Sequence, residues 1–245
     1  MAESNSVIPF GLGDAIRNLG IAKGELVALV GGGGKSTLLF AFGNFYGSGT
    51  ILTTTTKMGA NQVGRARLLV NPSLNELTSA VAEPDPVLIW DRVNESKAVG
   101  VDPSIPVQWL NIADRVIVEA DGSRGYPAKA PAPYEPVIPN FTKTVIAVIG
   151  ADAIDRVIED QCHRPLRVGG LLGCSPYERL TTERTAQLLL HPDGLRKGVT
   201  SDIRFKIAIT KVSESNLSLA SEVVQQLTLL DQNVEVVLVA ESNKQ

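Results

Sequence analysis

The chain is poor in the residues that mark disulfide-stabilised domains and multi-ligand metal centres. Its 245 residues include only two cysteines, Cys162 and Cys174, and two histidines. Two thiols twelve positions apart form no disulfide framework, and without a C-x-x-C spacing a structural zinc ion lacks a closed ligand set. A metal or selenium site at Cys162, His163 and Cys174 is therefore disfavoured against packed or idle thiols.

The chain also lacks a strong net charge and a long apolar run. Its 23 basic and 26 acidic residues leave a net charge of -3, so no overall field favours nucleic acid or an anionic membrane. No apolar run approaches the roughly 20 residues that span a bilayer, and residues 1–10 lack the cations of a signal peptide. We expect a cytoplasmic protein with no nucleic-acid and no membrane partner.

The composition that remains is typical of a globular α/β enzyme, with 44% hydrophobic and 20% charged residues. A large sheet can use this length as one unit, so we predict a single domain over 1–245 with a possible small insertion or flap around 155–180. Residues 123–139 contain five prolines and little apolar content, which predicts a semi-rigid loop directly after a strand.

Short apolar runs alternate along the chain with segments of helical length and spacing. We expect strands at 26–30, 50–52, 68–70, 87–90, 116–118, 145–149, 207–209 and 234–239. We expect helices at 12–19, 36–42, 73–81, 181–190 and 216–230. Because uninterrupted apolar runs are typical of strands covered on both faces, the predicted fold is a mostly parallel, doubly wound sheet with helices on both faces. The glycine-rich turn after the first strand, described next, makes the predicted fold P-loop NTPase-like.

A glycine-rich turn links the first expected strand to the next helix. A phosphate could be held here by the backbone N–H groups, by a lysine and, through Mg²⁺, by a hydroxyl, because glycine leaves no side chain in the way. The residues expected to hold ATP or GTP are Gly31, Gly32, Gly33, Gly34, Lys35, Ser36 and Thr37. The strict G-x-x-x-x-G-K-[ST] pattern fails at Leu29, so the order of strand, loop and helix supports the prediction over a turn that binds nothing.

Two acids, Glu119 and Asp121, follow the apolar run 116–118. P-loop enzymes hold the carboxylate that supports Mg²⁺ at such a strand end, and residues two apart on a strand share a face. We expect Ser36, Glu119 and Asp121 to form the metal site, with one acid as ligand and the other as base. The alternative is a strand that ends in solvated acids.

Further candidates lie at the same expected edge of the sheet, where ligands bind in open α/β folds. Thr55 and Lys57 end the second strand and could meet phosphate or substrate, although a threonine run is also ordinary strand material. Arg124 and Lys129 follow the acids, and either could neutralise a transferring phosphoryl group or bind an anionic second substrate. Their alternative is a pair of exposed cations.

Several of these motifs together resemble the YqeC family, whose members are associated with the maturation of selenium-dependent molybdenum hydroxylases. The similar segments are 30–37, 53–58, 119–124, 129–131, 135–139 and 150–152, which span most of the chain. The block from the acids to the prolines is long and unusual, so it is more specific than the glycine loop. The resemblance implies that the protein assists hydroxylase maturation, with an apo-hydroxylase or a cofactor-maturation protein as a partner.

Residues 210–213 resemble the base-recognition segment of metallochaperone GTPases, in which Asn or Thr, Lys and any residue precede an Asp. Ser213 replaces that Asp, so the two donors of the guanine edge lose their carboxylate partner, and we favour ATP slightly over GTP. Lys211 could still cover the base. The alternative is an ordinary loop.

Three functions are consistent with these residues. The first is a Mg²⁺-dependent NTPase or nucleotide-using transferase, in which Lys35, Glu119, Asp121 and Arg124 are the candidate catalytic residues. The second is a small-molecule kinase whose acceptor binds to residues 123–139. The third is a non-catalytic, nucleotide-gated carrier or assembly factor.

Overall fold

The computed structural model describes residues 8–241, which form an α/β fold around one large parallel sheet. Its eight strands lie in the order β13-β12-β10-β1-β8-β2-β5-β4, and every neighbouring pair is parallel. The bounds are β1 (Glu25–Gly31), β2 (Thr50–Thr54), β4 (Arg67–Val70), β5 (Val87–Trp90), β8 (Arg115–Glu119), β10 (Thr144–Gly150), β12 (Arg204–Val212) and β13 (Glu235–Ala240). All eight predicted strands are confirmed.

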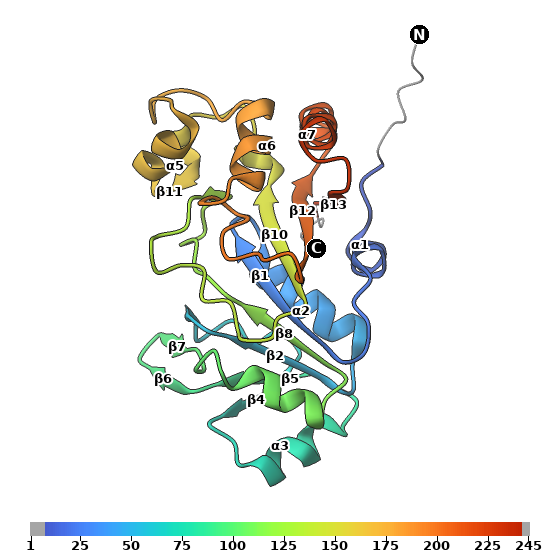
Figure 1. Cartoon of the computed structure of the whole chain (residues 1–245). Coiled ribbons are helices and arrows are strands. Elements are labelled where there is room, and N and C mark those ends of the chain that lie inside the picture. The colour runs from blue at the N-terminus through green and yellow to red at the C-terminus, as the bar shows by residue number, and fades with distance from the viewer. Residues whose placement is uncertain (1–7, 242–245) are drawn as a thin grey trace.

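Helices cover both faces of this sheet. Their bounds are α1 (Leu12–Leu19), α2 (Lys35–Tyr46), α3 (Leu74–Val81), α6 (Thr182–Leu190) and α7 (Leu217–Leu230), with short 3-10 helices η1 (Pro106–Asn111) and η2 (Ala151–Ala153). Val27 and Leu29 of β1 pack with α1 and α2, while Ala28 and Val30 pack with α6 and α7. Figure 1 shows α1 and α2 together on one side of the strands. This alternation explains why β1 is apolar throughout.

The predicted helices are confirmed to within a few residues because their ends carry local signals. Ser73 caps α3 in a capping box, in which its hydroxyl accepts from the Glu76 N–H and the Glu76 carboxylate accepts from the Ser73 N–H. Thr181 caps α6 in the same way by accepting from the Arg184 N–H. Such caps depend on a few adjacent residues, which is why sequence alone locates them.

A small antiparallel sheet was not predicted. It joins β3 (Lys57–Gly59), β7 (Lys97–Val99) and β6 (Arg92–Asn94), and the β6–β7 hairpin lies beside the main sheet in Figure 1. Each strand has only three residues, and β3 and β7 each bury a single one, so the sequence shows no apolar run there. Its first strand, β3, begins three residues after the end of β2.

The predicted insertion region contains regular structure. Residues 155–180 include α4 (Ile158–Gln161), β11 (Cys162–His163) and α5 (Pro165–Leu172), and β11 pairs with β9 (Ala128–Lys129) from the proline-rich loop. The loop 123–139 is otherwise irregular, as predicted.

No helix within residues 8–241 combines the length and the apolar character needed to cross a bilayer. The prediction about a signal peptide concerns residues 1–10, of which 1–7 lie outside the described part of the chain.

Candidate anion-binding site at the glycine loop

The glycine loop depends on backbone conformations that other residues rarely adopt. Gly31 and Gly33 have φ angles of 101° and 67°. A Cβ atom on Gly31 would collide with the Val148 carbonyl, and one on Gly33 would collide with the Gly150 backbone nitrogen. The loop therefore lies directly against the end of β10, and glycine is required at both positions.

The first turn of α2 presents four backbone N–H groups in a row without a partner. Within residues 8–241, no backbone or side-chain acceptor takes the N–H groups of Gly34, Lys35, Ser36 and Thr37. Gly34 is the N-cap residue and has no side chain that could accept from them. These donors and the positive end of the helix dipole form a site for an anion.

The Lys35 side chain is buried beneath this loop, with 3% of its surface exposed. Its ammonium group donates to the Gly31 carbonyl at 2.5 Å and lies 3.3 Å from Asp121 and 3.9 Å from Glu119. Two carboxylates thus compensate the burial of this side chain at the base of the loop.

Glu119, at the end of β8, faces the start of α2. Its carboxylate accepts a hydrogen bond from the Ser36 hydroxyl at 2.8 Å. Burial raises the pKa of Glu119, and the neighbouring Lys35 and the Ser36 hydrogen bond oppose that rise. Glu119 and Ser36 thus place two oxygen atoms side by side at the edge of the loop.

Asp121 is buried beneath the loop. Both of its carboxylate oxygens accept from the Gly31 N–H at 3.0 Å, and Lys129 lies 3.0 Å away on its other side. Lys129 is itself completely buried and pairs with Glu135 at 2.7 Å. Arg164, at the start of α5, completes the chain with Glu135 at 2.8 Å. These four residues and Lys35 form the buried ion network, defined as Lys35, Asp121, Lys129, Glu135 and Arg164.

A large open hollow lies in front of the loop, with a volume of about 660 Å³. We call it the basic hollow, since Lys35, Lys57, Lys97 and Arg124 line it and Glu119 is its only acid within the described residues. Lys57, Lys97 and Arg124 are exposed, and none of them forms an ion pair with another residue of the range 8–241. The hollow can therefore attract an anion larger than one phosphate group.

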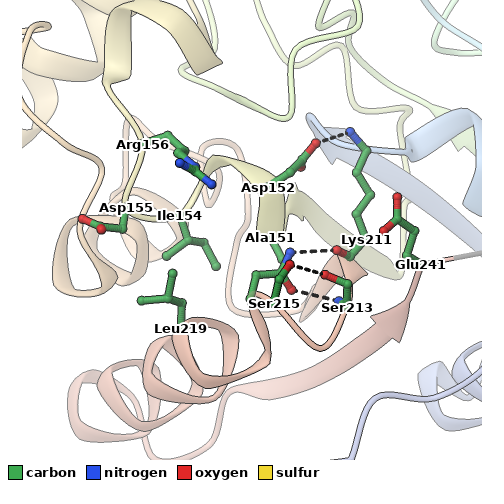
Figure 2. Close-up of a pocket in the computed structure, with 11 residues that line it drawn as sticks. Ala151, Asp152, Ile154, Asp155, Arg156, Lys211, Ser213, Ser215, Leu219 and Glu241 are labelled. Atoms are coloured by element: carbon green, nitrogen blue, oxygen red, sulfur yellow. Dashed lines mark hydrogen bonds and ion pairs between the residues drawn. The ribbon is translucent and has the colours of Figure 1, made fainter.

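A second hollow of about 380 Å³ lies on the other side of the loop and shares Gly33, Gly34 and Thr37 with the first. We call it the mixed-charge hollow, since Asp152, Lys211 and Glu241 line it. Thr210 also lines this hollow, and its hydroxyl donates to the Gly33 carbonyl of the glycine loop. Lys211 pairs with Asp152 at 2.6 Å, and Figure 2, a close-up of an adjoining hollow, shows this pair with Glu241 beside Lys211.

The structure separates the residues proposed from the sequence into three groups. Those that line the basic hollow are Gly33, Gly34, Lys35, Ser36, Thr37, Lys57, Glu119 and Arg124. Lys211 lines the mixed-charge hollow. Gly31 and Gly32 are buried within the loop, and Asp121 and Lys129 are buried beneath it. The Thr55 hydroxyl donates to the Val137 carbonyl at 2.6 Å, so it holds the proline-rich loop.

Sequence reasoning missed Lys97, Asp152 and Glu241 as lining residues. Lys97 belongs to the hairpin that carries no apolar pattern, and Glu241 follows β13, whose role at this edge is visible only once the strand order is known. Asp152 lies in a segment that resembles the YqeC family, but its partner Lys211 is far away in the sequence, so no local pattern predicts the pair.

The cysteines lie apart from this site. Burial raises the pKa of the Cys162 thiol to about 12, helped by its neighbour Cys174, so at neutral pH it is protonated and a poor metal ligand or nucleophile. Both cysteines are free. Within residues 8–241, no three His, Cys, Asp or Glu side chains are grouped so that they could hold a metal ion.

Comparison with known proteins identifies one family. A family model described as YqeC protein matches residues 27–166, which is more than half of the chain. The Uncharacterized protein YqeC of Escherichia coli (strain K12) is 29% identical over 211 residues, which is 82% of each chain. No solved structure matches. The matched segment includes the glycine loop, the basic hollow and the buried ion network, whereas Lys211 lies outside it.

Proposed function

The chain belongs to the YqeC family, and on that premise we propose that it binds a nucleoside triphosphate with Mg²⁺ at the glycine loop. The bound nucleotide is hydrolysed or donates its γ-phosphoryl group. The reaction assists the maturation of a selenium-dependent molybdenum hydroxylase or of its cofactor. The partner is an apo-hydroxylase or another maturation protein.

One observation carries the nucleotide proposal: four consecutive N–H groups at the start of α2 have no acceptor among the described residues, and a buried Lys35 lies beside them. Unsatisfied backbone donors are costly unless water or a ligand accepts from them. A chain of phosphates supplies several acceptor oxygens and negative charge at once. A turn that binds nothing gains no advantage from this arrangement.

Mg²⁺ fits the pair formed by Ser36 and Glu119. Their oxygens lie 2.8 Å apart, and two adjacent ligands of an octahedral Mg²⁺ with bonds of about 2.1 Å are about 3 Å apart. Mg²⁺ takes few protein ligands and completes its shell with phosphate oxygens and water. The ion would neutralise charge on the β and γ phosphates. Asp121 supports this site from beneath by holding Gly31 and Lys35.

The base and ribose fit the mixed-charge hollow, because it adjoins the loop through Gly33, Gly34 and Thr37. Lys211 supplies a long apolar stem that can cover a base. We propose ATP rather than GTP, since Ser213 supplies no carboxylate for the guanine edge and Asp152 is already paired with Lys211.

The proposal is tested by titration calorimetry with ATP and GTP, each with and without Mg²⁺. Lys35→Ala should weaken nucleotide binding by at least about tenfold, the effect of losing charge-assisted hydrogen bonds. Lys143→Ala removes an exposed lysine that lines neither hollow, so it should bind like the wild type. The site would be refuted if Lys35→Ala bound ATP and GTP as tightly as the wild type does.

The family role is tested separately. Purified protein with ATP and Mg²⁺ should increase the active fraction of an apo-hydroxylase that is matured in vitro. Glu119→Gln should abolish this effect while the protein still folds. Maturation that proceeds unchanged with Glu119→Gln would contradict a nucleotide-dependent role.

A further inference from the structure

We propose that the basic hollow holds a second ligand, a small molecule that carries a phosphate-like oxyanion, next to the nucleotide's terminal phosphate. This inference rests on the proposed function and extends it to the class of the second substrate. Lys57, Lys97 and Arg124 would bind the oxyanion. The four N–H groups and Lys35 would remain with the nucleotide.

The three cations come from separate parts of the chain and meet at one hollow. Lys57 lies on β3, Lys97 on β7 and Arg124 in the proline-rich loop. All three line the same hollow as the glycine loop. Convergence from three segments is unexpected for ordinary surface cations, which lie scattered and solvated.

The small antiparallel sheet places the two lysines on one face. Gly59 lies opposite Lys97, and Lys57 lies opposite Val99, so Lys57 and Lys97 are diagonal neighbours. Met58 and Ala98, between them, are buried on the other face. Like charges at such close positions repel and destabilise a short sheet. An anion bound between them removes this repulsion.

Arg124 is held in a backbone conformation that is uncommon for a residue with a side chain. Its φ angle is 53°, in the left-handed region that is strained for a residue with a side chain. Strain of this kind persists where the surrounding structure enforces it and is concentrated in ligand-binding segments. Here the Gly122 carbonyl accepts from buried Lys129 at 2.8 Å, which anchors the chain two residues before Arg124.

The hollow has room for a second ligand. Its volume of about 660 Å³ lies within the range of roughly 300–1,000 Å³ that accommodates a whole small molecule. The base and ribose are assigned to the separate mixed-charge hollow, so only the phosphates of the nucleotide occupy part of this space. Asn61 and Gln62 also line it and supply side-chain amides for the uncharged part of the ligand.

The test is calorimetric titration of inorganic phosphate into the protein, alone and saturated with Mg²⁺ and a non-hydrolysable ATP analogue. Without nucleotide, we expect two phosphate ions per chain, one at the loop and one at the three cations. With the analogue bound, one should remain. Its affinity should fall at least about tenfold in Lys57→Gln/Lys97→Gln, because two charge-assisted contacts are lost. The matched control is Arg67→Gln/Lys143→Gln, which removes two exposed cations outside both hollows.

Each outcome distinguishes this inference from the nucleotide assignment. Failure of the analogue to bind the wild type would count against the proposed function alone, and phosphate binding that is sensitive to Lys57 and Lys97 would still support the second site. Phosphate affinity that is equal in the lysine double variant and in the control would overturn the inference. The inference would also be overturned if the wild-type protein, saturated with Mg²⁺ and the ATP analogue, bound no phosphate.

Discussion

Two groups of charged side chains adjoin the glycine loop, and they differ in how they are paired. The buried ion network alternates in sign from Lys35 to Arg164, and each member contacts a partner of opposite charge. The exposed cations of the basic hollow, Lys57, Lys97 and Arg124, have no ion-pair partner between residues 8 and 241. Burial makes pairing obligatory, whereas exposure leaves charge free for a ligand.

We expect the buried ion network to stabilise the fold and the exposed cations to bind a ligand. Asp121 holds Gly31 and Lys35, so the network fixes the loop from which the N–H groups project. The side chains of Lys57, Lys97 and Arg124 form no ion pair with another residue of the range 8–241. Substitutions in the two groups should therefore affect different measurements.

The largest effect is expected from Lys129→Met, which keeps the apolar stem and removes the central buried charge. Asp121 and Glu135 then lose a shared partner, and breaking a buried pair typically costs about 3–5 kcal/mol of unfolding free energy. Urea unfolding followed by circular dichroism measures this. Lys143→Met, at an exposed position, is the control and should stay close to wild type. If the two variants unfolded at the same urea concentration, the network would not stabilise the fold.

A smaller and pH-dependent effect is expected at Glu135. Burial on its own raises the pKa of this carboxyl, but hydrogen bonds from Arg164 and Lys129 outweigh it and lower the pKa to about 2. The charged form therefore stabilises the fold above the ordinary carboxyl pKa, and this contribution is lost as pH falls towards 2. Glu135→Gln should cost about 1.5–3 kcal/mol at neutral pH, the usual value of hydrogen bonds to a charged group.

The measurement is urea unfolding of wild type and Glu135→Gln between pH 7 and pH 3. The difference between them should shrink steadily as the pH decreases below the unfolded-state pKa of about 4.3. Glu83→Gln, at an exposed acid, is the control and should show no such trend. A difference that stayed constant over this range would mean that the ion pairs of Glu135 contribute nothing.

Gly33→Ala affects the loop between the two groups of charges. The new methyl group would collide with the Gly150 backbone nitrogen. The φ angle of residue 33 is 67°, which is also strained for alanine. Backbone strain of this kind costs on the order of 1–3 kcal/mol. Nucleotide binding should be lost as well, since the N–H groups move. Gly170→Ala is the control, because its Cβ atom would meet nothing within 4 Å. Thermal unfolding and ATP calorimetry on both variants test the requirement for glycine.

The smallest change in stability is expected from Lys57→Gln/Lys97→Gln, the pair that should weaken phosphate binding. Exposed substitutions usually change unfolding free energy by no more than about 0.5 kcal/mol. Removal of the repulsion between two like charges could make this variant slightly more stable than wild type. A clear loss of stability in urea unfolding would place these lysines with the buried network and remove the distinction between the two groups.

Much of the fold was predictable because its signals are local. The apolar run before Gly31 and the caps at Ser73 and Thr181 each depend on a few adjacent residues. The same is true of the glycine loop, since four glycines followed by Lys35 are legible in the sequence. The hairpin with Lys97 was not predictable, because its three-residue strands are held by pairing with β3.

The candidate site was only partly predictable for a related reason. Glu119 and Asp121 are two residues apart, and the sequence treats them as equivalent acids on one edge. In the structure Glu119 lines the basic hollow, whereas Asp121 is buried against the Gly31 N–H and Lys129. Lys129 likewise reads as a surface cation in the sequence, yet it is completely buried.

The alternation of strands and helices, the glycine loop and the acids at the end of β8 can be located from the sequence, since apolar period, glycine and capping residues act over a few positions. Which charged side chains are buried in ion pairs, and which stay exposed, follows only from the three-dimensional arrangement of the strands. That division depends on the strand order, which brings residues 35, 121, 129 and 135 together and leaves 57, 97 and 124 at the surface. Pairing of buried charges is a long-range requirement, so no local pattern records it.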